Sequence, residues 1–129
     1  MCGIAGFSSV SPRSDLDQIR AAFMQSLAHR GPDGNGCIHS VNNDLLLVHT
    51  RLSILDTSSM GSQPMTSQCG RFSISFNGEI YNYREIRRQL TALGFEFLGS
   101  SDTEVLLELI AHELTIDVDF SPSTTLTRL

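Results

Sequence analysis

The chain begins Met1-Cys2-Gly3-Ile4-Ala5-Gly6-Phe7-Ser8, and residues 2–8 predict a short apolar strand. Gly3 and Gly6 indicate that another segment of backbone approaches closely. Removal of Met1, which a small second residue permits, would leave a thiol and a free amine on Cys2. An α-amino group has an ordinary pKa of about 7.7 to 8.0, so it can act as a general base near neutral pH. Cys2 therefore carries a nucleophile and its base, although a Cys after an initiator Met is usually an ordinary strand residue.

Size, charge and cysteine content limit the class of protein. The 129 residues make one domain at most, and the net charge of -5 argues against a nucleic-acid surface. No run approaches the roughly 18 apolar residues of a membrane span, and the N-terminus lacks a signal-peptide pattern. Cys2, Cys37 and Cys69 suit neither a disulfide framework nor a zinc site. We expect a cytoplasmic protein with no metal, membrane or nucleic-acid partner.

Helical periodicity predicts three helices. The first follows a candidate N-cap at Ser14 and ends before Gly31, and the second runs over residues 83–94. The third follows the capping-box pattern Ser101-Asp102-Thr103-Glu104 and reaches about Glu113.

Strand patterns occur between these helices, and they indicate a mixture of helices and strands without choosing a fold class. Polar residues Thr50 and Arg51 interrupt the longest apolar run. Two segments rich in Gly, Ser and Pro, 30–36 and 57–70, are predicted loops. The predicted strands are residues 45–55, 72–76, 95–98 and a weak one over 116–120.

Five short segments occur in a characteristic order, and any one of them alone is a weak signal. They are Met1-Cys2-Gly3-Ile4-Ala5-Gly6-Phe7, His29-Arg30-Gly31-Pro32-Asp33-Gly34, His49-Thr50-Arg51-Leu52-Ser53-Ile54-Leu55-Asp56, Asn77-Gly78-Glu79-Ile80-Tyr81-Asn82 and Ser101-Asp102-Thr103-Glu104. Together they resemble class II glutamine amidotransferases, and within that family the glutaminase domain of asparagine synthetases. The resemblance covers about residues 1–113. It implies an α+β fold of the N-terminal-nucleophile hydrolase type, an α-β-β-α sandwich with antiparallel sheets.

The resemblance also implies roles in hydrolysis of the glutamine side-chain amide. Cys2 would be the nucleophile, with its α-amine as the base. Asn77 and Gly78 match the pair that supplies the oxyanion donors, which a tetrahedral intermediate requires. Without the resemblance, Asn77-Gly78 is a plain turn.

Further residues match the groups that hold the glutamine backbone. Arg51 matches the arginine that binds the α-carboxylate, and arginine suits that planar group because it donates two parallel hydrogen bonds. Asp102 matches the aspartate that binds the α-ammonium group, with Glu79 as a second carboxylate near it. Leu52 and Ile54 would contribute backbone carbonyls. By themselves, Arg51 is a solvated strand-end charge and Asp102 a helix-start acid that interacts with the helix dipole.

Residues 114–129 depart from the family pattern, which continues into an apolar strand and a second sheet. We therefore expect a partial, C-terminally truncated glutaminase domain at 1–113 and a divergent tail at 114–129. No cofactor is expected in this chain, because ATP and Mg would belong to a synthetase domain absent from it. Three readings stay open: a fragment of an asparagine synthetase, a small amidotransferase subunit that docks on a synthetase and serves that or a different acceptor, and a non-catalytic glutamine-binding or regulatory module.

Overall fold

The central strand, β3 (Leu45–Arg51), forms from an apolar run and organises the first half of the chain. The computed structural model describes residues 2–42, 44–53 and 59–116. In this structure β3 pairs antiparallel with β1 (Gly3–Ser8) on one side and with β2 (Gly34–His39) on the other. Its alternate residues Leu46 and Val48 are fully buried on one face of the sheet, as a period of two requires.

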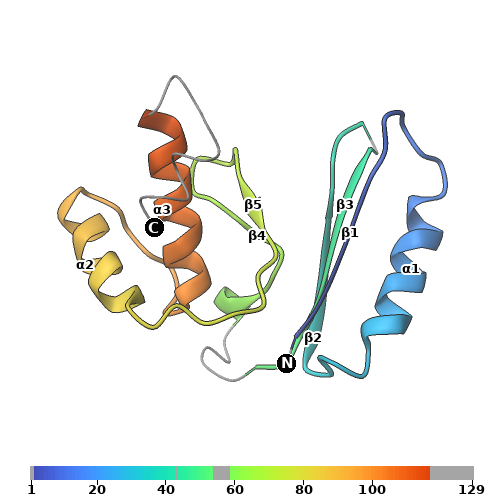
Figure 1. Ribbon diagram of the computed structural model, residues 1–129, viewed down its shortest axis with the longest axis horizontal. Helices are drawn as coiled ribbons and strands as arrows, with labels where there is room; N and C mark the ends of the chain where they lie inside the picture. The colour runs from blue at the N-terminus through green and yellow to red at the C-terminus, as the bar shows by residue number, and fades with distance from the viewer. Residues whose placement is uncertain (1, 43, 54–58, 117–129) are drawn as a thin grey trace.

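Helix α1 (Leu16–Leu27) covers that face of the sheet (Figure 1). Its apolar side chains, with Leu16 the most buried, pack against Leu46 and Val48. The buried Thr50 hydroxyl donates a hydrogen bond to the Leu27 carbonyl at 3.1 Å. Because the last carbonyls of a helix have no partner within it, this bond both satisfies one of them and ties the helix end to β3.

A second group of elements lies on the opposite side of the sheet (Figure 1). Two short strands, β4 (Met65–Thr66) and β5 (Ser73–Ile74), pair antiparallel, and helices α2 (Tyr83–Ala92) and α3 (Asp102–Ile116) pack against each other. A short 3-10 turn, η1 (Ser59–Gly61), precedes them. Leu90, Val105, Leu107 and Ala111 are the buried apolar residues of these two helices.

The start of α3 is fixed by local hydrogen bonds. The Ser101 hydroxyl accepts a hydrogen bond from the Glu104 N–H at 3.1 Å, which confirms the predicted helix cap. The Glu104 carboxylate in turn accepts hydrogen bonds from the backbone N–H groups of Leu98 and Gly99, at 2.7 and 2.9 Å. These bonds join the approaching chain to the first turn of the helix.

The α+β class with antiparallel pairing is confirmed, and so are the three helices. The predicted loop 30–36 is wrong at its end, because β2 begins at Gly34. A Cβ at Gly36 would lie 2.3 Å from the Gln63 carbonyl oxygen, so this glycine marks a close backbone approach rather than a turn. Within the described residues, no helix has the length and apolar content that crossing a membrane requires.

The predicted loop 57–70 is wrong at η1 and at β4, where Met65 and Thr66 pair with β5. The predicted strands 45–55 and 72–76 are longer than the observed ones, because β3 ends at Arg51 and β5 spans only Ser73–Ile74.

Other expectations also differ from the structure. Residues 95–98 form no strand, because Phe95 packs edge-on against His112 of α3 and Arg87 lies over the Phe97 ring at 4.6 Å. Helix α1 has Asp15 at its N-cap rather than Ser14, without a side-chain capping bond. Helix α3 continues past Glu113 to Ile116, so a strand from residue 116 is wrong at its first residue, and its remainder lies outside the described residues.

The end of β3 is braced by the segment that follows α1. Pro32 bridges to Arg51, and the Asp33 N–H donates to the Arg51 carbonyl at 3.0 Å. Gly31 passes so close to this strand that a Cβ on it would lie 2.4 Å from the Thr50 carbonyl carbon. Since the clashing atoms are backbone atoms, a side chain at Gly31 would have to displace β3 itself.

Gly31→Ala is therefore expected to lower the free energy of unfolding by about 2 kcal/mol, as overpacking against an unyielding partner does. Gly34→Ala is the matched control, because the nearest atom to its new Cβ would be the Arg51 Cβ at 3.9 Å. That variant should change stability by less than about 0.5 kcal/mol. Urea denaturation followed by circular dichroism measures both. Equal stabilities for the two variants would contradict the close approach at Gly31.

Candidate active site

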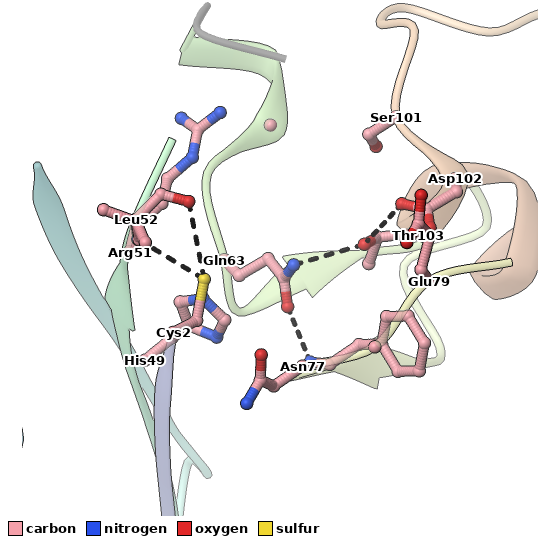
Figure 2. Close-up of a pocket in the computed structure, with 13 residues that line it drawn as sticks. Cys2, His49, Arg51, Leu52, Gln63, Asn77, Glu79, Ser101, Asp102 and Thr103 are labelled. Atoms are coloured by element: carbon pink, nitrogen blue, oxygen red, sulfur yellow. Dashed lines mark hydrogen bonds between the residues drawn. The ribbon is translucent and has the colours of Figure 1, made fainter. Parts of the chain in front are cut away.

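A cavity of about 410 Å³ lies between the three-stranded sheet and the second group of elements. The first half of the chain contributes one wall, and the loops around β4, β5 and the start of α3 contribute the other (Figure 2). Seven of the eight predicted site residues line it: Cys2, Arg51, Leu52, Asn77, Gly78, Glu79 and Asp102. Ile54, the eighth, lies outside the described residues.

Cys2 precedes β1, and the backbone of Leu52 holds its sulfur. The Leu52 N–H donates to the sulfur at 3.4 Å, and the Cys2 thiol donates to the Leu52 carbonyl at 3.7 Å (Figure 2). An N–H group directed at sulfur stabilises negative charge there, which a thiolate nucleophile needs. The Arg30 guanidinium donates to the Cys2 carbonyl at 3.3 Å, so this arginine orders the N-terminal backbone. Cys2 is thus fixed by groups from two other segments.

Arg51 ends β3 next to Leu52, on the same wall as Cys2. The antiparallel register pairs Gly3 of β1 with Thr50, which brings the residue before Gly3 alongside Arg51 and Leu52. Asp33 reinforces the strand end, because its carboxylate accepts a hydrogen bond from the Ser53 N–H at 2.8 Å. The cation and the thiol therefore share one wall through strand pairing.

Asn77 and Gly78 lie between two anchored backbone groups. The Phe76 N–H donates to the side-chain carbonyl of Gln63 at 2.6 Å, and the Ile80 N–H donates to the Asp102 carboxylate at 2.9 Å. A Cβ at Gly78 would lie 2.5 Å from the Phe76 ring, so a side chain here would require that ring to move. Asn77, Gly78 and Glu79 are themselves exposed, so the segment presents them to the cavity without burying them.

Asp102 opens α3 and is 6% exposed. Its carboxylate accepts the Ile80 N–H and lies 3.5 Å from the Thr103 hydroxyl, which donates to it. The first turn of a helix favours negative charge, so the Asp102 carboxylate interacts favourably with the dipole of α3. The same carboxylate also lines the cavity. Glu79 lies near Asp102 on this second wall, opposite Cys2 and Arg51 (Figure 2). The cavity thus has a thiol and a cation on one wall and two carboxylates on the other.

His49 lines the cavity although it was not predicted as a site residue. It is 1% exposed, and its Nδ1 lies 3.0 Å from the Ser75 hydroxyl. Burial, and then the charge of Arg51, lower the pKa of His49 below its ordinary value. Its Nε2 is buried without a hydrogen-bond partner in the part of the chain that the structure describes. The available signal was the spacing: His49 precedes Arg51 by two residues, so both point to one face of the strand.

Gln63 is another cavity residue that was not predicted as a site residue, as are Gly61, Phe76, Ser101 and Thr103. Gln63 lies between η1 and β4, in a segment whose sequence has no periodic pattern to mark a role, and it donates through Nε2 to the Thr103 hydroxyl at 3.2 Å. Only the fold brings Gln63 to this place, since its partners are residues far along the chain.

Comparison with known proteins assigns the family. The family described as a glutamine amidotransferase domain matches residues 1–114. Asparagine synthetase [glutamine-hydrolyzing] 1 of Bacillus subtilis is 39% identical over 115 residues, which covers 87% of this chain and 18% of that protein. An asparagine synthetase [glutamine-hydrolyzing] of Sandersonia aurantiaca is 38% identical over 110 residues, covering 84% and 20%.

A relative with a different name is equally similar. Amidase chry2 of Gibberella zeae is 40% identical over 122 residues, which covers 87% of this chain and 18% of that protein. The chain thus spans about a fifth of the length of the curated relatives it matches. The family predicted from the five ordered segments is confirmed: this chain belongs to the glutamine amidotransferase domain family.

Proposed function

We propose that this chain is a glutaminase module in which Cys2, freed by removal of Met1, hydrolyses the side-chain amide of glutamine. The observation that carries the proposal is the Cys2 sulfur, held by the Leu52 backbone in a cavity that also receives Arg51, Asn77-Gly78 and Asp102. These groups come from separate segments of the chain. A cavity with a thiol, a cation and carboxylates on opposing walls suits an amino acid that carries an amide.

The reaction proceeds by acyl transfer. The α-amine of Cys2 takes the thiol proton, the sulfur attacks the amide carbon, and a carbon–sulfur bond forms. The Asn77 side-chain amide and the Gly78 N–H stabilise the oxyanion. The amide nitrogen takes the proton and leaves as ammonia, which breaks the carbon–nitrogen bond and leaves a γ-glutamyl thioester. Water then adds to the thioester, releasing glutamate and the Cys2 thiol.

The polar ends of glutamine bind at the two walls. Arg51 binds the α-carboxylate through two parallel hydrogen bonds, and Asp102, with Glu79 near it, binds the α-ammonium group. The carbonyl of Leu52 completes the site, and a contribution from Ile54 stays a prediction because this residue lies outside the described part of the chain. Glutamine held at both ends places its amide carbon against the sulfur, and such positioning accounts for much of the rate of a displacement reaction.

The proposal extends to the fold and to the use of the ammonia. We assign the module, residues 1–113, to the N-terminal-nucleophile hydrolase type, with 114–129 as a divergent tail and a boundary inside α3. The asparagine synthetase relatives favour delivery of ammonia to a synthetase domain or subunit that uses ATP and Mg to make asparagine from aspartate. The amidase relative, at 40% identity, favours a second candidate, transfer to a different acceptor.

Cys2→Ala is expected to reduce glutamine hydrolysis by about 10³-fold or more, because the reaction loses its nucleophile. Release of glutamate and of ammonia measures the rate. Cys69→Ser is the control, since Cys69 is exposed and lies outside the cavity. Hydrolysis that survives Cys2→Ala at the rate of the parent chain would refute the nucleophile.

Arg51→Lys is expected to raise the KM for glutamine about 10- to 100-fold, because a lysine cannot donate the paired hydrogen bonds to a carboxylate. Arg88→Lys, on the exposed face of α2, should leave KM unchanged. Steady-state kinetics with glutamine measures both. The variant should also lose its preference for glutamine over 4-aminobutanamide, which lacks the α-carboxylate. If that preference persists, Arg51 does not bind the carboxylate.

Folding stability should fall as the pH drops below about 6.5, the ordinary pKa of a histidine in an unfolded chain. Because the pKa of His49 is lowered in the folded protein, the unfolded chain binds the proton first. The contribution of neutral His49 is complete above that pH and decreases below it, by up to about 1.4 kcal/mol per pH unit. Urea denaturation at several pH values measures this slope. His49→Gln, which cannot titrate, should have a shallower slope, and parallel curves for the two proteins would contradict the assignment.

A further inference from the structure

Gln63 connects the two walls of the cavity. Its backbone rests on the sheet, because a Cβ at Gly36 of β2 would lie 2.3 Å from its carbonyl oxygen. Its side chain extends across the cavity toward β5 and α3 (Figure 2). The position of this side chain is therefore set by one wall, whereas its hydrogen bonds are made with the other.

Both polar atoms of the Gln63 amide are used. The oxygen accepts the Phe76 N–H at 2.6 Å, and the nitrogen donates to the Thr103 hydroxyl at 3.2 Å. A carboxamide is the shortest group that can accept with one atom and donate with another in these two directions. A carboxylate of the same shape could keep the bond from Phe76 but could not donate to the Thr103 hydroxyl, because it has no hydrogen to donate.

The hydrogen bonds continue to Asp102. The Thr103 hydroxyl donates to one oxygen of the Asp102 carboxylate at 3.5 Å, the longest link of the series. The other oxygen accepts the Ile80 N–H at 2.9 Å. The segment from Phe76 to Ile80, which presents Asn77 and Gly78, is thus held at both ends by one connected set of polar groups. Connected hydrogen bonds in a partly buried site strengthen one another and restrict motion.

We propose that Gln63 is a positioning residue that links the binding of the substrate ammonium group at Asp102 to the placement of the oxyanion donors Asn77 and Gly78. This inference rests on the proposed function for the roles of those three residues. An ammonium group that draws the Asp102 carboxylate toward the cavity moves the acceptor of Ile80 and, through Thr103 and Gln63, the acceptor of Phe76. Both ends of the oxyanion segment then respond to one binding event.

Two substitutions at Gln63 test its hydrogen bonds to Phe76 and to Thr103 separately. Gln63→Met keeps the length of the side chain and removes both hydrogen bonds, whereas Gln63→Glu keeps the acceptor for Phe76 and loses the donor to Thr103. Gln89→Met, on the exposed face of α2, is the control for a glutamine with no place in the cavity. Amide exchange measured residue by residue in the full chain reports the hydrogen bonds at Phe76 and Ile80 directly.

In Gln63→Met, exchange should accelerate at both Phe76 and Ile80 by about fivefold or more beyond any change in the amides of β3, which report global opening. In Gln63→Glu, Phe76 should stay protected and Ile80 alone should accelerate. A role confined to local packing would affect Phe76 and leave Ile80 unchanged. Unchanged exchange at Ile80 in both variants would overturn the proposal.

Kinetics tests the catalytic consequence. Gln63→Met should lower kcat about 10- to 100-fold, as a misplaced catalytic group does, and raise KM as well. Alkylation of Cys2 by iodoacetamide needs neither the oxyanion donors nor Asp102, so its rate should stay within about twofold of the parent chain. Wild-type kcat and KM in Gln63→Met would overturn the proposal. If the parent chain hydrolyses no glutamine while the exchange pattern holds, the proposed function fails and the link between Asp102 and the 76–80 segment is still supported.

Discussion

The antiparallel register between β1 and β3 determines which residues of the first half of the chain meet at the cavity. Pairing of Gly3 with Thr50 brings Cys2 next to the end of β3, where the Leu52 backbone contacts the Cys2 sulfur. Because side chains alternate along a strand, a slip of one residue would turn His49 and Arg51 toward α1 and bury Leu47 in place of Val48. The apolar core under α1 therefore specifies the register, and the register specifies the site.

The cavity depends on two groups of elements that have separate packing. The sheet packs its apolar core against α1. In the second group, Leu90 of α2 and Val105 of α3 are buried. Contacts between the groups at the cavity include the hydrogen bond between His49 and Ser75 and the approach of the Gln63 backbone to Gly36. Polar contacts depend on direction more than apolar packing does, so they fix orientation where the core cannot.

Seven residues of the candidate site could be named from the sequence because they lie in short local motifs that resemble segments of a known family. Without that resemblance, Arg51 is only a strand-end charge and Asn77-Gly78 only a turn. The helices could be predicted because periodicity and the Ser101 cap are local. Strand β2 was missed because glycines such as Gly34 and Gly36 are typical of loops. The backbone that approaches Gly36 closely is that of Gln63, which is 27 residues further along the chain. Gln63 and Thr103 are 40 residues apart, and no local pattern records such a bond.

The groups that contact the Cys2 sulfur are main-chain groups of Leu52 rather than side-chain groups. Nineteen of the twenty amino acids carry the same N–H, and proline alone lacks it. The polarity that these main-chain groups give the sulfur is thus shielded from point mutation at position 52, except to proline. A residue-by-residue substitution survey would accordingly record position 52 as tolerant, even though its backbone makes both hydrogen bonds to the Cys2 sulfur.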